Sequence, residues 1–233
     1  MTTAVDLANR ALTIIGTRSQ IQSLTEASPE AQAVATVYAS ALDRALVRFP
    51  WGFARRRLVL AVVKAAAGLP QNPDGAQAAP GGGWRFACLP PADCLRLIAV
   101  EPPGTAVAAG QGRGRTPFEE GVDVDYAGAE RAVILTDLPV AEATYIRRLD
   151  NPALFPPLFQ TVLVAELAQD IALTLTGSVS VANGAMAAAD RALSAAEEVE
   201  AATGPLSVPR RVPDAIVARH GGFGFRRFDR RGE

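Results

Sequence analysis

Residue types that enzymes use most for acid–base and metal chemistry are scarce in this sequence of 233 residues, which holds one histidine and two cysteines. The histidine, His220, lies in a glycine-rich stretch, so no histidine-based triad or metal cluster can be assembled around it. Cys88 and Cys94 are six positions apart, which matches neither a Cys-x-x-Cys pair nor a zinc site, and we expect both to be small buried apolar residues. We therefore expect no enzymatic activity, no metal site and no cofactor.

An excess of one charge and long apolar runs are also lacking. The chain has 23 basic and 24 acidic residues and a net charge of -1, which argues against nucleic-acid binding as its main function. The longest apolar stretch, residues 158–175, is interrupted by glutamines and acidic residues, so we expect no membrane span. The N-terminus lacks the basic and then apolar pattern of a signal peptide. These absences favour a globular protein made in the cytoplasm, with no membrane partner.

Helical patterns occupy both ends of the folded part of the chain. Ser28 and Pro29 are typical of a helix start, and Gly177 is in the position of a C-terminal helix cap. The alanine-rich face of the last helix is expected to pack closely on the helix before it. The predicted helices cover about residues 3–15, 29–49, 157–176 and 179–203.

Short strands with turn residues between them fill the middle of the chain. They are expected at about residues 59–63, 84–89, 95–100, 122–126, 133–135 and 144–148. In the fourth of these, Val122 and Val124 alternate with Asp123 and Asp125, so we expect the aspartates on a wet face. The strands predict one small antiparallel sheet, folded as a sandwich or half-barrel.

The predicted fold class is therefore α+β, a four-helix body with an inserted small antiparallel β-module and an extended C-terminal arm. The expected boundaries are residues 1–54 and 150–203 for the two parts of the helical body, 55–149 for the β-module and 204–233 for the arm. Trp51 and Phe53, at the junction of helix and sheet, are expected to be buried anchors that fix the β-module on the helices.

The arm differs in composition from the rest of the chain. It carries seven arginines against three acidic residues, a net charge of +4, and has no apolar periodicity that would give it a core of its own. We expect it to be ordered by a partner, with anchors that combine apolar area and charge-assisted bonds. These candidate contact residues are Phe223, Phe225, Arg226, Arg227 and Phe228.

Two charged clusters in the β-module have two interpretations each. Arg55, Arg56 and Arg57 could contact a phosphate backbone, or they could form a solvated strand start. The acidic residues between 119 and 125 could hold a hard cation, but the outer face of a half-exposed sheet explains them better. Arginine fills every basic position except Lys64, as in proteins from GC-rich genomes, so a single arginine carries little weight.

Several segments in order along the chain resemble the head–tail connector proteins of tailed phages, of the tail tubular protein A type. The first is Leu-Asp-Arg-Ala-Leu at 42–46, followed by Phe-Pro-Trp-Gly-Phe-Ala at 49–54 and Arg-Leu at 57–58. The later ones are FACLPPADCLRL at 86–97, Tyr-Ile at 145–146, Pro152, Phe-Pro at 155–156 and the long helix 158–177. Together with an opening helix that also fits, they span most of residues 5–200.

The resemblance implies a structural role without catalysis. Such a protein forms a ring of about twelve copies beneath the portal protein, since a channel for DNA demands cyclic symmetry. Its expected partners are the portal, a tail or stopper protein, further copies of itself and the DNA that passes through. Its expected place is the head–tail junction of a virion or a phage-like gene-transfer particle, and the arm is expected to dock on the portal.

Two other functions remain open on the sequence alone. The first is a nucleic-acid-binding packaging accessory protein that uses Arg55–Arg57 and the basic arm, and its binding would depend strongly on salt. The second is a hydrolase with a carboxylate site that includes Asp123 or Asp125, and a divalent metal would stabilise it.

Overall fold

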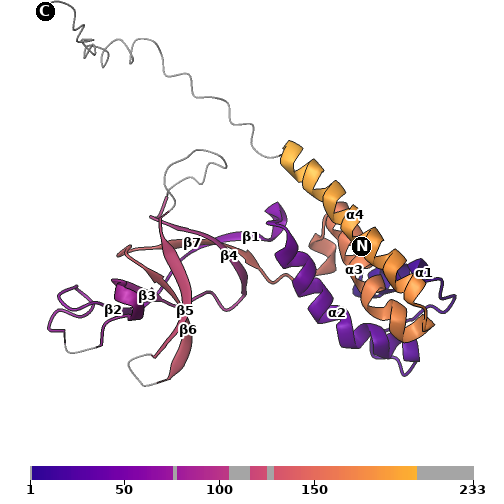
Figure 1. Ribbon diagram of the computed structural model, residues 1–233, viewed down its shortest axis with the longest axis horizontal. Coiled ribbons are helices and arrows are strands. Elements are labelled where there is room, and N and C mark those ends of the chain that lie inside the picture. Colours follow the sequence, from indigo (N-terminus) through magenta and orange to yellow (C-terminus); the bar gives the residue numbers. More distant parts are fainter. Residues whose placement is uncertain (1, 76–77, 105–115, 125–128, 204–233) are drawn as a thin grey trace, which may run out of the picture. The chain divides into compact units, whose positions relative to one another are not determined.

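The computed structural model describes residues 2–75, 78–104, 116–124 and 129–203 (Figure 1). Its helices are α1 (Ala4–Ile14), α2 (Pro29–Arg48), α3 (Pro157–Thr176) and α4 (Val179–Thr203). Its strands are β1 (Arg55–Val59), β2 (Val62–Ala65), β3 (Phe86–Cys88), β4 (Cys94–Glu101), β5 (Phe118–Val124), β6 (Glu130–Thr136) and β7 (Glu142–Arg147). Helices and antiparallel sheets are both present, so the predicted α+β class is confirmed. The arm that begins at Gly204 lies outside the described residues.

The helix ends follow the expected capping rules. Ser28 accepts a hydrogen bond from the Ala31 N–H, and Pro29 takes the first helical position of α2. Thr3 and Asp6 form a reciprocal capping box at the start of α1. Gly177 ends α3 at a φ of 63°, a left-handed conformation that glycine adopts without strain.

The helices share one apolar core. α3 lies at its centre and contacts α1, α2 and α4. By length and composition α3 is the one described helix that could cross a membrane, but its apolar residues are those of the core, which accounts for their number. Ala185, Ala189 and Ala196 of α4 are almost fully buried, and α4 packs on α3, which confirms the predicted role of its alanines.

The strands form two sheets rather than the single sheet expected from the sequence. The first sheet has the order β1-β7-β4, and the second has the order β2-β3-β6-β5. The expectation of one strand at residues 59–63 is wrong, because β1 ends at Val59, β2 begins at Val62, and the chain passes from one sheet to the other between them. The Leu60 N–H bonds to the Ala141 carbonyl, and the Ala61 carbonyl accepts from the Leu89 N–H.

The first sheet is covered on both faces. Tyr145 and Ile146, neighbours in β7, are both fully buried although their side chains point to opposite faces of the sheet. Ile146 belongs to the helical core, whereas Tyr145 packs with Phe86 and Ile134 of the second sheet. The first sheet therefore joins the helices to the second sheet.

The second sheet curls on itself. β2 and β5 are its two outer strands, which would lie about 14 Å apart in a flat sheet of four strands. Yet Lys64 Nζ of β2 lies 2.9 Å from Asp123 Oδ1 and 3.1 Å from the Val124 carbonyl of β5. A register shift between Val62 and Lys64 adds to the curl, because bulges increase strand twist. This curl encloses a small apolar cluster of Ala87, Val133 and Leu135, separate from the core that holds Tyr145, with Val63 and Trp84 packed against it.

The faces of β5 are the reverse of the expected ones. The side chain of Asp123 is only 16% exposed, whereas Val122 is 71% and Val124 44% exposed. The buried ammonium of Lys64 explains the difference, because it draws Asp123 to the inner side of the curled sheet and leaves the valines outside. Asp125 and Tyr126 lie outside the described residues.

Candidate functional site

Aromatic side chains gather where the helices meet the first sheet. Trp51 is 1% exposed, and its indole N–H donates to the Ala45 carbonyl of α2 at 2.9 Å. Its ring lies edge-on to those of Phe49 and Phe159, with centroids 5.2 Å away in both cases. The Phe53 ring lies 4.9 Å from that of Phe159. The segment 49–54 and the start of α3 thus meet in one aromatic cluster, although about a hundred residues separate them.

Arginines from the first sheet bind the last turn of α2 and the segment that follows it. Arg55 of β1 donates to the Pro50 carbonyl, and Arg96 of β4 donates to the Val47 carbonyl, both at 3.0 Å. Both arginines pair in register with Ile146 of β7, so they flank the side chain that enters the helical core. Val47 lies in the last turn of α2, where carbonyls lack helical partners and carry partial negative charge, so the Arg96 cation binds there favourably. Arg55 therefore has a structural bond within the chain.

The structure places Arg56 on the opposite face of the first sheet. Its guanidinium lies 3.3 Å from Asp93 Oδ2, and the Tyr145 hydroxyl donates to Asp93 Oδ1 at 2.9 Å. Burial, together with the neighbouring Asp93, raises the pKa of Tyr145 to about 12. Arg57 is exposed on β1 and also has an interaction within the chain. Consecutive strand residues alternate between faces, so these three arginines do not form one flat basic surface.

A buried carboxylate links three helices, and the sequence analysis did not find it. Glu166 of α3 is 1% exposed and bonds to Arg44 at 2.7 Å and to Arg48, both from α2. Arg44 also binds Asp170, and Arg48 binds Asp190 of α4. Burial would lower the pKa of Arg44, but the bonds from Asp170 and Glu166 raise it overall. The available signal was the four-residue spacing of both arginines and of two acids, which places each pair on one helix face.

The acidic cluster of the β-module has partners within the chain. Asp123 accepts from Lys64 and from the backbone N–H groups of Gly81 and Val124. Desolvation acts to raise the pKa of Asp123, but these bonds lower it overall. Glu119 accepts from the Trp84 indole at 3.0 Å. Within the described part of the chain, no three metal-ligand side chains come together.

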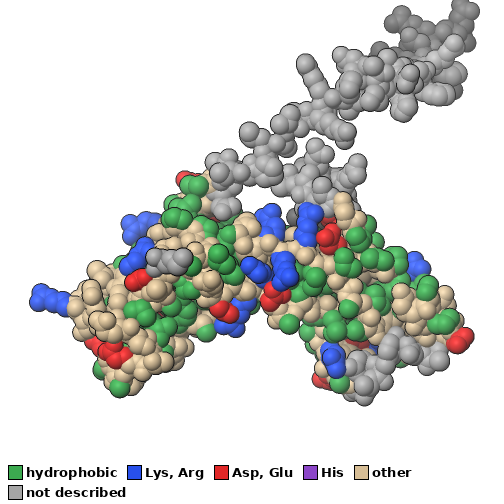
Figure 2. Space-filling view, turned by 180° about the vertical axis from the view of Figure 1, so that it is seen from behind, with side chains coloured by type: hydrophobic (Ala, Val, Ile, Leu, Met, Phe, Trp, Pro, Cys, Tyr) green, Lys and Arg blue, Asp and Glu red, His purple; other side chains and the backbone are tan. Residues whose placement is uncertain are grey.

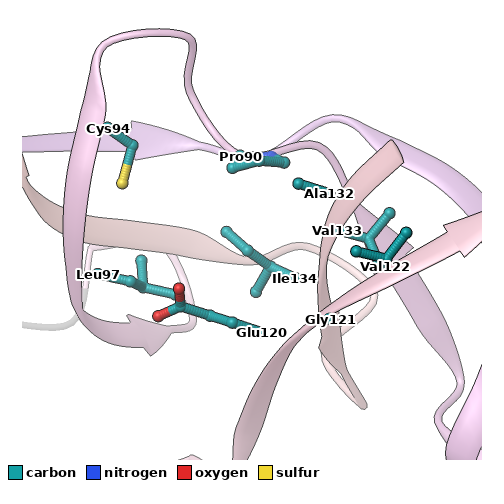
Figure 3. Close-up of a pocket in the computed structure, with 9 residues that line it drawn as sticks. All are labelled: Pro90, Cys94, Leu97, Glu120, Gly121, Val122, Ala132, Val133 and Ile134. Atoms are coloured by element: carbon teal, nitrogen blue, oxygen red, sulfur yellow. The ribbon is translucent and has the colours of Figure 1, made fainter. Parts of the chain in front are cut away.

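A pocket of about 310 Å³ opens between β4 and the β5–β6 pair (Figure 3). The side chains of Glu120, Cys94 and Ile134 point into it. Burial raises the pKa of Cys94 to about 11, and the nearby charges of Glu120 and Asp93 add to this effect. The lining is otherwise apolar, so no activated nucleophile is present there. Cys88 is fully buried, and both thiols are free.

Charges on the surface are mixed. On the face in Figure 2, basic and acidic side chains are interspersed, with hydrophobic side chains exposed between them. The candidate arm contacts Phe223, Phe225, Arg226, Arg227 and Phe228 lie outside the described residues, as does His220.

The chain matches no family model and no curated protein. Its described part is a mixed helix-and-sheet protein with two antiparallel sheets, in which an aromatic cluster and arginine bonds fix the first sheet to a helical body.

Proposed function

We propose that this protein is a structural head–tail connector, an adaptor subunit that forms a ring beneath the portal of a phage or phage-like particle. It joins the capsid vertex to the tail, binds a tail or stopper protein on its far side and leaves a channel for DNA. Its place is the head–tail junction, and its role is structural rather than catalytic.

The aromatic cluster is the observation that carries the proposal. The resemblance to connectors was based on short segments, among them 49–54 and Phe-Pro at 155–156. These two segments meet in space, because the ring centroid of Phe53 lies 6.2 Å from that of Phe155 and 4.9 Å from that of Phe159. Motifs from distant parts of a sequence that make one contact are more specific together than either alone. The aromatic cluster also fixes the first sheet to the helices, as an adaptor that transmits load between capsid and tail requires.

The nucleic-acid-binding alternative is less well supported. It depends on Arg55–Arg57, but Arg55 bonds to the Pro50 carbonyl and Arg56 to Asp93. The carboxylate hydrolase is also less well supported, because Lys64 already neutralises Asp123. A connector needs neither a continuous basic face nor a reactive group.

Co-purification with the portal tests the proposal. Full-length protein is mixed with portal rings from the same particle, and binding is measured by sedimentation and by electron microscopy. The connector function requires stable rings seated on the portal. Retention on DNA with strong salt dependence, and no binding to the portal, would instead favour the packaging accessory protein.

Removal of residues 204–233 tests the role of the arm in the same assay. We expect portal binding to fall sharply and the melting temperature of the remaining chain to stay the same. Full portal binding by the shortened chain would show that the arm is not the portal contact.

A further inference from the structure

β1 is an open edge of the first sheet with basic and apolar side chains. Among the described strands, β7 alone pairs with it, along the register from Arg55–Ile146 to Val59–Glu142. Every residue of β1 is exposed, and the arginines are followed by Leu58 at 42% and Val59 at 51% exposure. An open edge presents main-chain N–H and C=O groups that another strand can bind.

β5 is an open edge of the second sheet with acidic and apolar side chains. β6 is the one described strand that pairs with it, and Lys64 covers its end at Val124. The remaining part includes Glu119, Glu120 and Val122, whose exposed fraction of 71% is the highest among the exposed large apolar side chains described. Glu120 is exposed and forms no hydrogen bond or ion pair with the described residues. This edge therefore carries charge opposite to that of β1.

We propose that β1 of one copy pairs with β5 of the next copy, so that successive subunits join through their sheets. This inference rests on the proposed function, since it supplies the contact between subunits of the ring. A ring needs a head-to-tail contact in which each copy offers two different surfaces. The edges of β1 and β5 are two such surfaces on one chain.

Charge and apolar area both favour this pairing. The net positive charge of β1 and the net negative charge of β5 attract each other, although Arg55, Arg56 and Glu119 also bond within their own copy. Cross-strand pairs of opposite charge stabilise a sheet. Leu58, Val59 and Val122, exposed in the single copy, become covered when the strands pair. Main-chain hydrogen bonds between the edges add affinity, as in other cases of strand addition.

The same charges oppose the alternative contacts. If β1 met β1 of another copy, arginines would face arginines, and if β5 met β5, glutamates would face glutamates. Like charges directly opposite each other destabilise a sheet. A two-fold dimer through either edge is therefore disfavoured, and the head-to-tail contact remains.

The test uses charge reversal on each edge of the full-length chain. Arg57→Glu changes β1 and Glu120→Arg changes β5, and each variant is examined by sedimentation velocity and electron microscopy with portal rings from the same particle. Arg191→Glu and Glu198→Arg, at exposed positions of α4, make the same charge changes away from both edges. Circular dichroism and thermal melting show that each variant is folded.

We expect either edge variant alone to need a concentration about tenfold higher, or more, for ring assembly, and the two α4 variants to assemble as the wild type does. In an equal mixture of the edge variants, the reversed β1 of one meets the reversed β5 of the other, while the unchanged edges meet each other. The mixture should therefore form rings that neither variant forms alone.

Two results would overturn this contact while leaving the connector function in place. One is ring assembly of both edge variants at the wild-type concentration. The other is a wild-type chain that forms rings and a mixture of edge variants that stays monomeric. A wild-type chain that neither binds the portal nor forms rings overturns the connector function and this contact together.

Discussion

Trp51 lies between the end of α2 and the start of β1, and its ring packs between aromatic side chains at positions 49 and 53. Its ring packs against both neighbours and against Phe159, and its one polar atom is satisfied by the Ala45 carbonyl. A buried tryptophan needs such a partner, because an unpaired N–H in an apolar core is costly. At this residue, one side chain fixes the helical body and the start of β1 at the same time.

Truncation of Trp51 should therefore destabilise the whole fold. Trp51→Ala removes a fully buried ring and leaves a cavity, so we expect the free energy of unfolding to fall by about 3–5 kcal/mol. Urea unfolding followed by circular dichroism measures the change. Val122→Ala, at an exposed position, is the control and should alter stability by less than about 0.5 kcal/mol. An unchanged urea midpoint in Trp51→Ala would contradict the role assigned to the ring.

The buried Glu166 makes a second prediction at the residue scale. The double variant Arg44→Ala, Arg48→Ala leaves its carboxylate buried without a countercharge, which should lower stability by about 2–4 kcal/mol. This loss is smaller than the roughly 3–5 kcal/mol usual for a broken buried ion pair, because the Arg44 and Arg48 side chains are 40% and 34% exposed and solvent screens them. Addition of Glu166→Leu removes the buried charge and should restore much of the loss. A triple variant as unstable as the double one would show that the arginines act by packing instead.

At the scale of elements, the α3–α4 turn depends on the conformation of one glycine. Gly177 has a φ of 63°, and an added Cβ would meet no atom within 4 Å, so backbone strain is the only cost of a side chain. Gly184, inside α4, also has open space around it but lacks the positive φ. We expect Gly177→Ala to destabilise the protein by about 1 kcal/mol and Gly184→Ala to stabilise it by about 0.5–1 kcal/mol. Thermal melting should show a lower melting temperature for Gly177→Ala and a higher one for Gly184→Ala. Equal shifts in the same direction would contradict the role assigned to the positive φ of Gly177.

The ion pair between β2 and β5 predicts a dependence of stability on pH. Because Lys64 and two backbone N–H groups lower the pKa of Asp123 in the folded state, its contribution to stability is complete above the ordinary pKa of an aspartate, about 3.9. The contribution is lost as the pH falls through the lower pKa of the folded state. Asp123→Asn should lower stability at pH 7 and make the loss of stability between about pH 5 and pH 2 less steep. Thermal melting of the wild-type chain and the variant over this pH range measures the difference. Parallel curves for both chains would contradict it.

The elements were easier to predict from sequence than their pairing. Pro29, Gly177 and the apolar periodicity determine the helices locally, so their ends were found to within a few residues. The passage from the first to the second sheet at Leu60 depends on bonds to Ala141 and Leu89, far along the chain. The faces of β5 were reversed because alternation alone does not say which side another strand will cover, and Lys64 decided it.

The candidate site residues show the same difference between features that local sequence determines and features that depend on tertiary structure. The burial of Trp51 follows from its place between two elements, so the sequence could indicate it. The bonds of Arg96 to Val47 and of Arg55 to Pro50 depend on tertiary structure, as does the ion pair of Glu166 with Arg44. The arm contacts at residues 223–228 rest on composition and on the resemblance to connectors, and they stay a prediction.

At the scale of the whole molecule, the first sheet is shared between two cores. Ile146 belongs to the helical core and Tyr145 to the core between the sheets, so neither core is complete without β7. Arg96 of the first sheet donates to the Val47 carbonyl of α2. Arg148, which follows β7, forms an ion pair with Asp43 of α2. The proposed connector function would benefit from such a connection, because the two parts of the chain then resist separation under load.

This shared sheet predicts a single cooperative unfolding transition. If the β-module unfolded first, Ile146 would leave the helical core and expose apolar surface there, which raises the cost of separate unfolding. Differential scanning calorimetry should therefore give one peak, with calorimetric and van't Hoff enthalpies that agree. Ile146→Ala should lower stability by about 2–5 kcal/mol and move the entire peak, since the side chain supports both parts. Met186→Ala, at a half-exposed position of α4, is the control and should leave the peak almost in place. Two resolved peaks in the wild-type chain, or loss of only one part in Ile146→Ala, would show that the helical body and the β-module unfold independently.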